Sequence, residues 1–172
     1  MSDNSTNLHQ TKLWKVLIQR RSVLFGLIIL FVIGFCAVFA PWITSIDPSA
    51  IAVRSRLLPP GAEHWLGTDE FGRDIFTRLI YAGRVSLTVG IGVAIISSFV
   101  GSIMGLVSGF FKRLDGPISR LVDAMMAFPD ILLAISLVAV LGGTVTNVII
   151  ALSIVYTPRI ARIVRASTLV IR

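Results

Sequence analysis

The chain alternates between long apolar runs and short polar segments, and this pattern predicts a helical protein that crosses a membrane four times. The expected spans cover about 23–43, 85–111, 122–141 and 145–164. About 20 helical residues, at roughly 1.5 Å each, are enough to cross the hydrocarbon core of a bilayer. We therefore assign residues 23–46 to a first transmembrane helix and residues 85–172 to a larger transmembrane domain.

The segment between the first two spans, residues 47–84, is polar and contains five acidic and five basic residues. Its Pro-Pro-Gly sequence at 59–61 marks a break in regular structure. After the break, Asp74 is a suitable N-cap for a short helix that ends near Ala82. The apolar residues within 75–80 share one face of that helix. This face predicts a helix in the membrane interface, or one packed on the outer end of the protein.

Composition makes lipid, rather than water, the expected surroundings of the four spans. Of the 172 residues, 55% are hydrophobic and 15% are charged, whereas a soluble domain averages about 25% charged residues. The net charge of +7 is distributed over short basic clusters between the apolar runs. Because nucleic-acid binding requires a continuous basic patch, we do not expect nucleic acid as a partner.

The distribution of charge also predicts how the chain crosses the membrane. Basic residues are in excess in the N-terminal tail (residues 1–22), after the second span and at the C-terminal end, whereas charges balance in residues 47–84. Short loops rich in Lys and Arg remain in the cytoplasm. We therefore predict a cytoplasmic N-terminus and an extracytoplasmic loop over residues 47–84.

Four small residues recur at every fourth position of the second span: Ser97, Gly101, Gly105 and Gly109. This spacing places them on one face of a helix. In membranes such faces let neighbouring helix backbones approach closely. We interpret these four residues as a helix-packing surface rather than as part of a transport path.

Asp130 is an ionisable residue inside the third span, where charge is costly and often functional. It follows Pro129, and a carboxylate in the first turn of a helix is stabilised by the helix dipole. Two interpretations are open: Asp130 caps a helix that restarts after a kink, or it faces a translocation path. Asp123 is expected to pair with Arg120 or a lipid headgroup, and a proton relay through both aspartates is a further alternative.

Arg159, Arg162 and Arg165 are spaced by three residues near the end of the fourth span. This spacing keeps them on roughly one side of a helix. They are either interfacial anchors, whose long side chains reach out of the apolar core, or a contact surface for a cytoplasmic partner.

The sequence contains no constellation typical of an enzyme. A nucleophile elbow, a P-loop and a zinc-binding His-Glu-x-x-His helix are all absent. The single cysteine, Cys36, lies in an apolar run, and His9 and His64 are not in a ligand-spaced cluster. We therefore expect no enzymatic activity, no metal site and no cofactor.

Four segments together resemble one family of transport proteins. Residues 66–81 read LGTDEFGRDIFTRLIY and resemble the signature LGTDxxGRDxxSRLIYG of permease subunits of dipeptide, oligopeptide, glutathione and nickel ABC importers. The segments at 83–87, 123–129 and 159–165 resemble that family's GARxSL, D(I/V)xxAxP and xxARxVR sequences, in the same order. The signature residues that match are Gly67, Thr68, Asp69, Gly72, Arg73, Asp74 and Arg84.

The resemblance implies an all-α, multi-pass transmembrane bundle with the type I ABC importer permease fold, of which the first four spans are present. It implies a bacterial inner-membrane protein that forms, with a sister permease subunit, the pathway for peptides or similar small solutes. The implied partners are two cytoplasmic ATP-binding subunits, which hydrolyse ATP, an extracytoplasmic solute-binding protein and the lipid bilayer.

Two departures from the family pattern bear on this interpretation. Ala82-Gly83 reverses the usual Gly-Ala order, and the chain ends at Arg172, before the Glu-Ala-Ala loop that couples such permeases to their ATPases. The sequence is therefore expected to be a fragment, or else an inactive truncated permease. A non-transporting membrane scaffold of four helices is the alternative function. No residue identifies the substrate.

Overall fold

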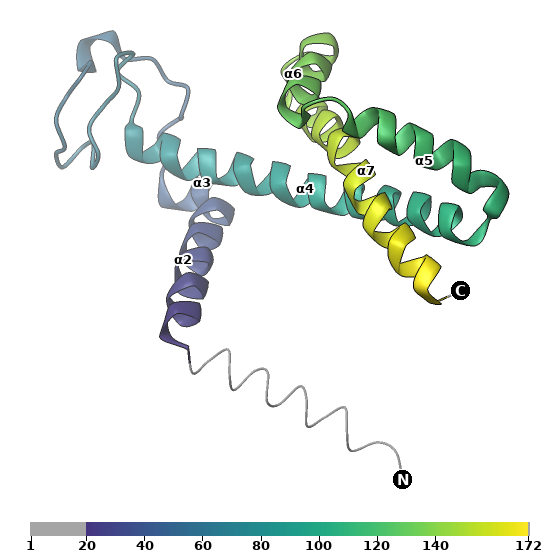
Figure 1. Cartoon of the computed structure of the whole chain (residues 1–172). Coiled ribbons are helices and arrows are strands. Elements are labelled where there is room, and N and C mark those ends of the chain that lie inside the picture. Colours follow the sequence, from purple (N-terminus) through teal and green to yellow (C-terminus); the bar gives the residue numbers. More distant parts are fainter. Residues whose placement is uncertain (1–19, 172) are drawn as a thin grey trace. The chain divides into compact units, whose positions relative to one another are not determined.

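The computed structural model describes residues 20–171 and consists of helices joined by loops (Figure 1). It divides into two compact units, Met1–Arg84 and Val85–Arg172, and the division falls within one long helix. Most of the predicted cytoplasmic tail, residues 1–22, lies outside the described residues. The elements are α2 (Arg21–Val38), α3 (Ala40–Ile43), the 3-10 helix η1 (Val53–Ser55), α4 (Ile75–Phe110), α5 (Lys112–Met126), α6 (Asp130–Leu141) and α7 (Val145–Ile171).

Three of the described helices, α2, α4 and α7, are long and apolar enough to cross a membrane. A fourth crossing results if the bent pair of α5 and α6 is counted as one span. Most apolar side chains of α2 are exposed, including Phe31, which is 71% exposed. Such a continuous apolar surface is unfavourable in water and favourable in lipid. The predicted class of multi-pass helical membrane protein is therefore confirmed.

The predicted first span is interrupted before its end. α2 ends at Val38 and the short helix α3 follows it, with Pro41 in the first turn of α3. Proline has no N–H to donate and its ring clashes with the carbonyl of the preceding turn, so a helix restarts there more easily than it continues.

The long helix α4 corrects the prediction of a separate short helix that ends near Ala82. Asp74 caps the helix as predicted, because its Oδ2 accepts a hydrogen bond from the Thr77 N–H at 2.7 Å. The helix then continues without a break to Phe110. Gly83 is the only residue of weak helix propensity near the expected end, and one interior glycine costs only about 1 kcal/mol.

The third predicted span is also corrected. Helix α5 begins at Lys112, in a segment expected to be a loop, and Pro117 lies inside it. The buried side chain of Val122 packs α5 on α7 and offsets the hydrogen bond that Pro117 cannot make. The chain then turns by 91° between α5 and α6, where Pro129 precedes the first residue of α6, Asp130.

Helix α7 continues beyond the expected end of the fourth span and contains Pro158 without a break. A tight turn precedes α7 at Gly142, which has a φ of 93°. Together with α5, α6 and the C-terminal part of α4, α7 forms the second unit, shown in teal to yellow in Figure 1.

The second unit is held together by small residues at a close contact between α4 and α7. A Cβ atom added at Gly105 would lie 2.6 Å from the carbonyl oxygen of Ala161, and one at Gly101 would lie 2.9 Å from that of Thr157. Ser97 is 2% exposed. Because glycine has no Cβ, the two helix backbones lie closer together than larger residues would permit.

Candidate functional site

The signature segment of the first unit is a compact loop that depends on two glycines. Gly67 and Gly72 both have a φ of 75°, in the region that favours glycine. A Cβ atom at Gly72 would lie 1.8 Å from the Ala52 carbonyl oxygen, and one at Gly67 would lie 2.4 Å from that of Leu58. The loop therefore packs directly against the backbone of residues 52–58.

Asp69 organises the turn that follows it. Its Oδ1 accepts hydrogen bonds from the N–H groups of Phe71 at 2.8 Å and Arg73 at 2.9 Å. Its Oδ2 accepts from the Arg73 Nε at 2.8 Å and also from the Arg78 guanidinium. Desolvation alone would raise the pKa of Asp69, but the hydrogen bonds from Arg73 and Phe71 outweigh it and lower this pKa to about 2.

Thr68 and Asp74 lie in the interior of the loop, each 4% exposed. The Thr68 hydroxyl donates to the Ser55 carbonyl at 2.5 Å and accepts from the Leu58 N–H at 2.9 Å. Besides capping α4, Asp74 lies 2.9 Å from Nδ1 of His64. Desolvation raises the pKa of Asp74, yet the bonds from Thr77 and His64 leave this pKa below its usual value.

These two carboxylates predict how the loop responds to acid. A carboxyl group whose pKa is lowered by folding stabilises the fold above its unfolded pKa of about 4, and this stabilisation is lost as the pH falls through the folded pKa. We expect the loop to loosen between about pH 4 and pH 2. Trp65, whose ring lies 4.9 Å from Phe76, reports the loss of this contact as a change in its emission when Trp14 and Trp42 are replaced by Phe.

Asp69→Asn in the same background is expected to show the changed emission already at neutral pH, because an amide cannot replace the charge-assisted bonds. Glu70→Gln is the matched control, since Glu70 is adjacent and exposed. An unchanged emission from pH 5 to pH 2 in the unsubstituted loop would show that Asp69 does not organise it.

The second unit contains three ion pairs that connect α7 to α5 and α6, which we call the ion-pair ladder. All three arginines of the 159–165 segment participate, and each contacts a different aspartate. The shortest N–O distances are 2.7 Å for Arg159 and Asp130, 2.5 Å for Arg162 and Asp123, and 2.5 Å for Arg165 and Asp115.

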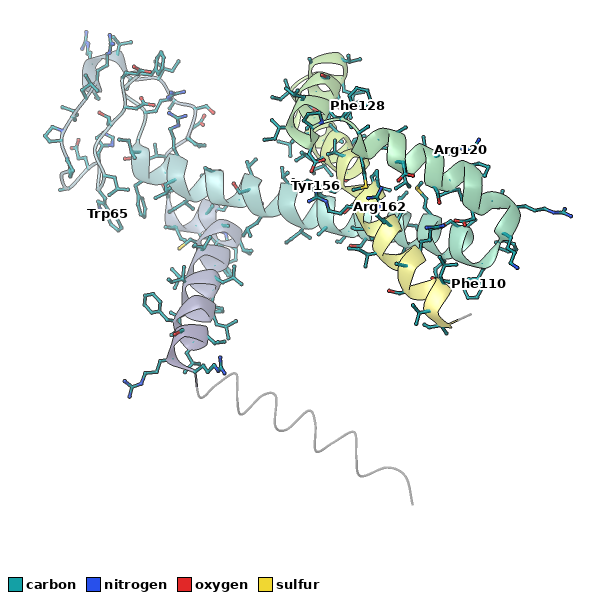
Figure 2. The ribbon with its side chains drawn as sticks, in the orientation of Figure 1. Trp65, Phe110, Arg120, Phe128, Tyr156 and Arg162 are labelled. Carbon is teal, nitrogen blue, oxygen red and sulfur yellow. The ribbon has the colours of Figure 1, made fainter. Side chains whose placement is uncertain are left out.

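The ladder corrects the expected partner of Asp123, which is Arg162 and not Arg120. Arg120 and Arg162 lie on different helices, α5 and α7, and both are labelled in Figure 2. The side chains of Arg159 and Arg162 remain 57% and 51% exposed. The pairing therefore occupies one side of each guanidinium and leaves the rest of it accessible.

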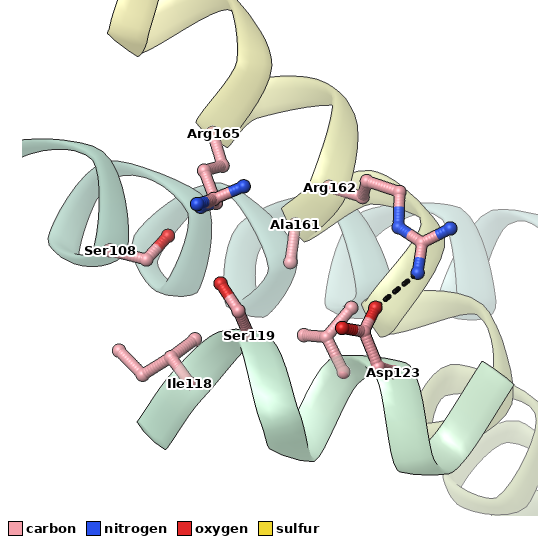
Figure 3. A pocket seen from close by; sticks show the side chains of 8 residues that line it. Ser108, Ile118, Ser119, Asp123, Ala161, Arg162 and Arg165 are labelled. Atoms are coloured by element: carbon pink, nitrogen blue, oxygen red, sulfur yellow. Dashed lines mark hydrogen bonds and ion pairs between the residues drawn. The ribbon is translucent and has the colours of Figure 1, made fainter. Parts of the chain in front are cut away.

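A small cavity of about 50 Å³ lies beside the ladder, between α5, α7 and the end of α4 (Figure 3). Ser108, Ser119 and Asp123 contribute oxygens to its wall, and Arg162 and Arg165 contribute guanidinium groups. The Ser119 hydroxyl donates to Asp115 at 3.2 Å, and Ser108 donates to the Gly105 carbonyl at 3.0 Å. Because each of these polar groups already has a hydrogen-bond partner within the second unit, the cavity belongs to the packing of the ladder.

The first pair of the ladder has different surroundings. Asp130 lies on the wall of a cavity of about 190 Å³, and Arg159 lies on the wall of an open groove of about 400 Å³. Leu152 and Tyr156 line both spaces, and the Arg159 guanidinium lies 6.0 Å from the centre of the Tyr156 ring. This is where the structure places the residue expected either to cap a helix or to face a translocation path.

Sequence reasoning did not identify several interaction partners in the signature loop and in the ion-pair ladder. No sequence motif marks the roles of His64, Arg78, Asp115 and Tyr156. The ladder also joins residues that are 29 to 50 positions apart in the chain. Arg84, the last signature residue, lies within α4 rather than in the loop.

Comparison with known proteins identifies the class of this chain. A family described as the binding-protein-dependent transport system inner membrane component matches residues 97–172. A second family, described as the N-terminal TM domain of oligopeptide transport permease C, matches residues 11–60. The chain is thus a multi-pass inner-membrane component of the permease class.

Individual relatives narrow the class. A Brucella suis protein named as a peptide transport system permease is 51% identical over 156 residues, which are 91% of this chain and 53% of the relative. The dipeptide transport system permease protein of Alkalihalophilus pseudofirmus is 43% identical over 92% of this chain and 53% of its own length. The glutathione transport system permease protein of Pectobacterium atrosepticum is 36% identical over 99% of this chain and 57% of its own length.

Residues 11–60 and 97–172 thus match two families of transport permeases, and these matches confirm the resemblance of the signature segments to permease subunits. It spans about half the length of the curated relatives it matches.

Proposed function

We propose that this protein is a permease subunit of an ABC importer and forms, with a sister permease, the membrane pathway for peptides or similar small solutes. The observation that carries this proposal is the match of nine-tenths of the chain to permeases named for peptide, dipeptide and glutathione transport. The signature loop and the apolar helices are the parts of the chain that such a role uses.

The proposal assigns the energy source to other subunits. ATP is bound and hydrolysed by two cytoplasmic ATP-binding subunits, as the resemblance of the signature segments implies. A solute-binding protein delivers cargo from outside, in agreement with the description of the matching family as binding-protein-dependent. The excess of basic residues at the N-terminal tail supports a cytoplasmic N-terminus.

The proposed roles of the individual residues follow their places in the fold. The signature loop is a rigid extracytoplasmic surface, and the small residues at 97–109 pack α4 on α7. Asp130 faces the translocation path. The exposed sides of Arg162 and Arg165 are available to a cytoplasmic partner, while their aspartates hold them in position.

Purification from native membranes tests the assignment. A tagged full-length gene product is expected to copurify with a second permease and an ATP-binding subunit, and the reconstituted complex is expected to import a dipeptide only when ATP and the binding protein are supplied. Recovery without any ATP-binding subunit would favour the membrane scaffold instead.

A cytoplasm-active reporter fused to the N-terminus is expected to be active, and an inactive reporter would reverse the topology.

A further inference from the structure

The Asp130–Arg159 pair differs from the rest of the ladder because its two charges face open space lined by apolar side chains. The side chain of Asp130 is 40% exposed and that of Arg159 is 57% exposed. The groove beside Arg159 is lined mainly by valine, alanine, leucine and isoleucine. Its volume of about 400 Å³ lies within the range of small-molecule sites, about 300–1,000 Å³.

We propose that Asp130 and Arg159 form a recognition site for zwitterionic small solutes, in which Arg159 binds a carboxylate and Asp130 binds an ammonium group. This inference rests on the proposed transport function and names the charge class of its cargo. Both groups are at the surface of adjoining cavities that share Leu152 and Tyr156, so one solute can reach both.

Charge balance explains why a zwitterion fits this site better than a simple ion. In the unliganded protein, the 2.7 Å pair neutralises both charges. A zwitterion replaces this one pair with two, and no charge is left without a partner. A solute that is only an anion would bind Arg159 and leave Asp130 without a partner. A solute that is only a cation would bind Asp130 and leave Arg159 without a partner. Beside these apolar side chains, a charge without a partner is less favourable than a paired one.

Tyr156 supports the exchange of partners. Its ring lies 6.0 Å from the Arg159 guanidinium, at the limit for a cation–π contact. This contact remains when Asp130 is displaced, so Arg159 stays at the cavity wall.

Cargo preference in the assembled importer tests the proposal. Uptake into proteoliposomes is measured for alanyl-alanine, its N-acetyl derivative, which is an anion, and its C-terminal amide, which is a cation. In Asp130→Asn the ratio of dipeptide to N-acetyl uptake is expected to fall about tenfold relative to wild type. In Arg159→Gln the ratio of dipeptide to amide uptake is expected to fall by a similar factor. The same binding protein is used throughout, so its own preference cancels.

The second pair of the ladder provides the control. Asp123→Asn and Arg162→Gln remove the same kind of ion pair between α5 and α7, but neither residue lines the two cavities. These variants are expected to change uptake of all three solutes by the same factor. If Asp130→Asn and Arg159→Gln also act equally on all three solutes, the pair only holds α6 on α7 and the inference is wrong.

A labelling experiment is independent of whether these variants assemble. Ala134 lines the cavity beside Asp130, and Ala134→Cys in a Cys36→Ser background is alkylated in the complex. The dipeptide is expected to slow alkylation several-fold more than either blocked derivative. Equal effects of all three solutes would overturn the site. A wild-type complex that imports no dipeptide would instead overturn the proposed function itself.

Discussion

Gly72→Ala is expected to disrupt the signature loop while leaving the helices intact. Alanine at a φ of 75° costs of order 1–3 kcal/mol in backbone strain, and its Cβ would lie 1.8 Å from the Ala52 carbonyl oxygen. The loop must therefore shift away from residue 52. A cost of about 2 kcal/mol raises the open population roughly 30-fold.

Limited trypsin digestion measures this effect, because Arg54 and Arg56 lie in the segment that packs on Gly72. Trypsin cleaves such a segment faster when the population in which its backbone is released from this packing rises. Gly61→Ala is the matched control in the same loop, since its Cβ would meet only the Pro59 carbonyl, at 3.9 Å. It is expected to be cleaved at the wild-type rate. Equal cleavage of the two variants would mean that the loop does not depend on the close approach at Gly72.

Gly105→Leu is expected to force α7 away from α4 and to destabilise the second unit. The added Cβ would lie 2.6 Å from the Ala161 carbonyl oxygen and 2.7 Å from the Val164 Cβ, and backbone atoms cannot move aside as a flexible side chain can. Overpacking of this kind costs typically 1–3 kcal/mol. At about 2–4 °C per kcal/mol for a chain of this length, the apparent melting temperature in detergent is expected to fall by about 2–12 °C.

Gly90→Leu is the control for the intrinsic effect of replacing a glycine in α4, because nothing lies within 4 Å of its added Cβ. It is expected to leave the melting temperature unchanged or slightly higher, since leucine is the better helix former.

The Gly105→Leu variant is also expected to separate Arg165 from Asp115, because the backbone N of Arg165 would lie 3.0 Å from the new Cβ. Arg165→Gln should therefore cost less in the Gly105→Leu background than in wild type. Fully additive effects would argue against this coupling.

Membrane residence, the helical class and the family were predictable from the sequence, because each depends on local properties. A run of about 20 apolar residues is sufficient for a span, and the signature at 66–81 is contiguous in the chain. The cap at Asp74, the turn at Gly142 and the helix start at Asp130 were also predictable, since each depends on one or two neighbouring residues.

The ends of helices were less predictable. Gly83 did not end α4 and Pro117 did not prevent α5. The free energy by which each of these residues destabilises its helix is smaller than the stabilisation that the helix gains from packing.

The sequence by itself therefore determined the membrane surroundings, the class and the signature loop of this protein, whereas the tertiary structure decided which charges form pairs. Asp123 pairs with Arg162, 39 positions away, rather than with Arg120 on its own helix. Asp74 meets His64 across the loop, and Asp130 meets Arg159 at the edge of two cavities. Helix periodicity fixes only which residues share a face. The partner across that face depends on how the chain turns, here by 91° between α5 and α6, and on how closely glycines let α4 and α7 approach.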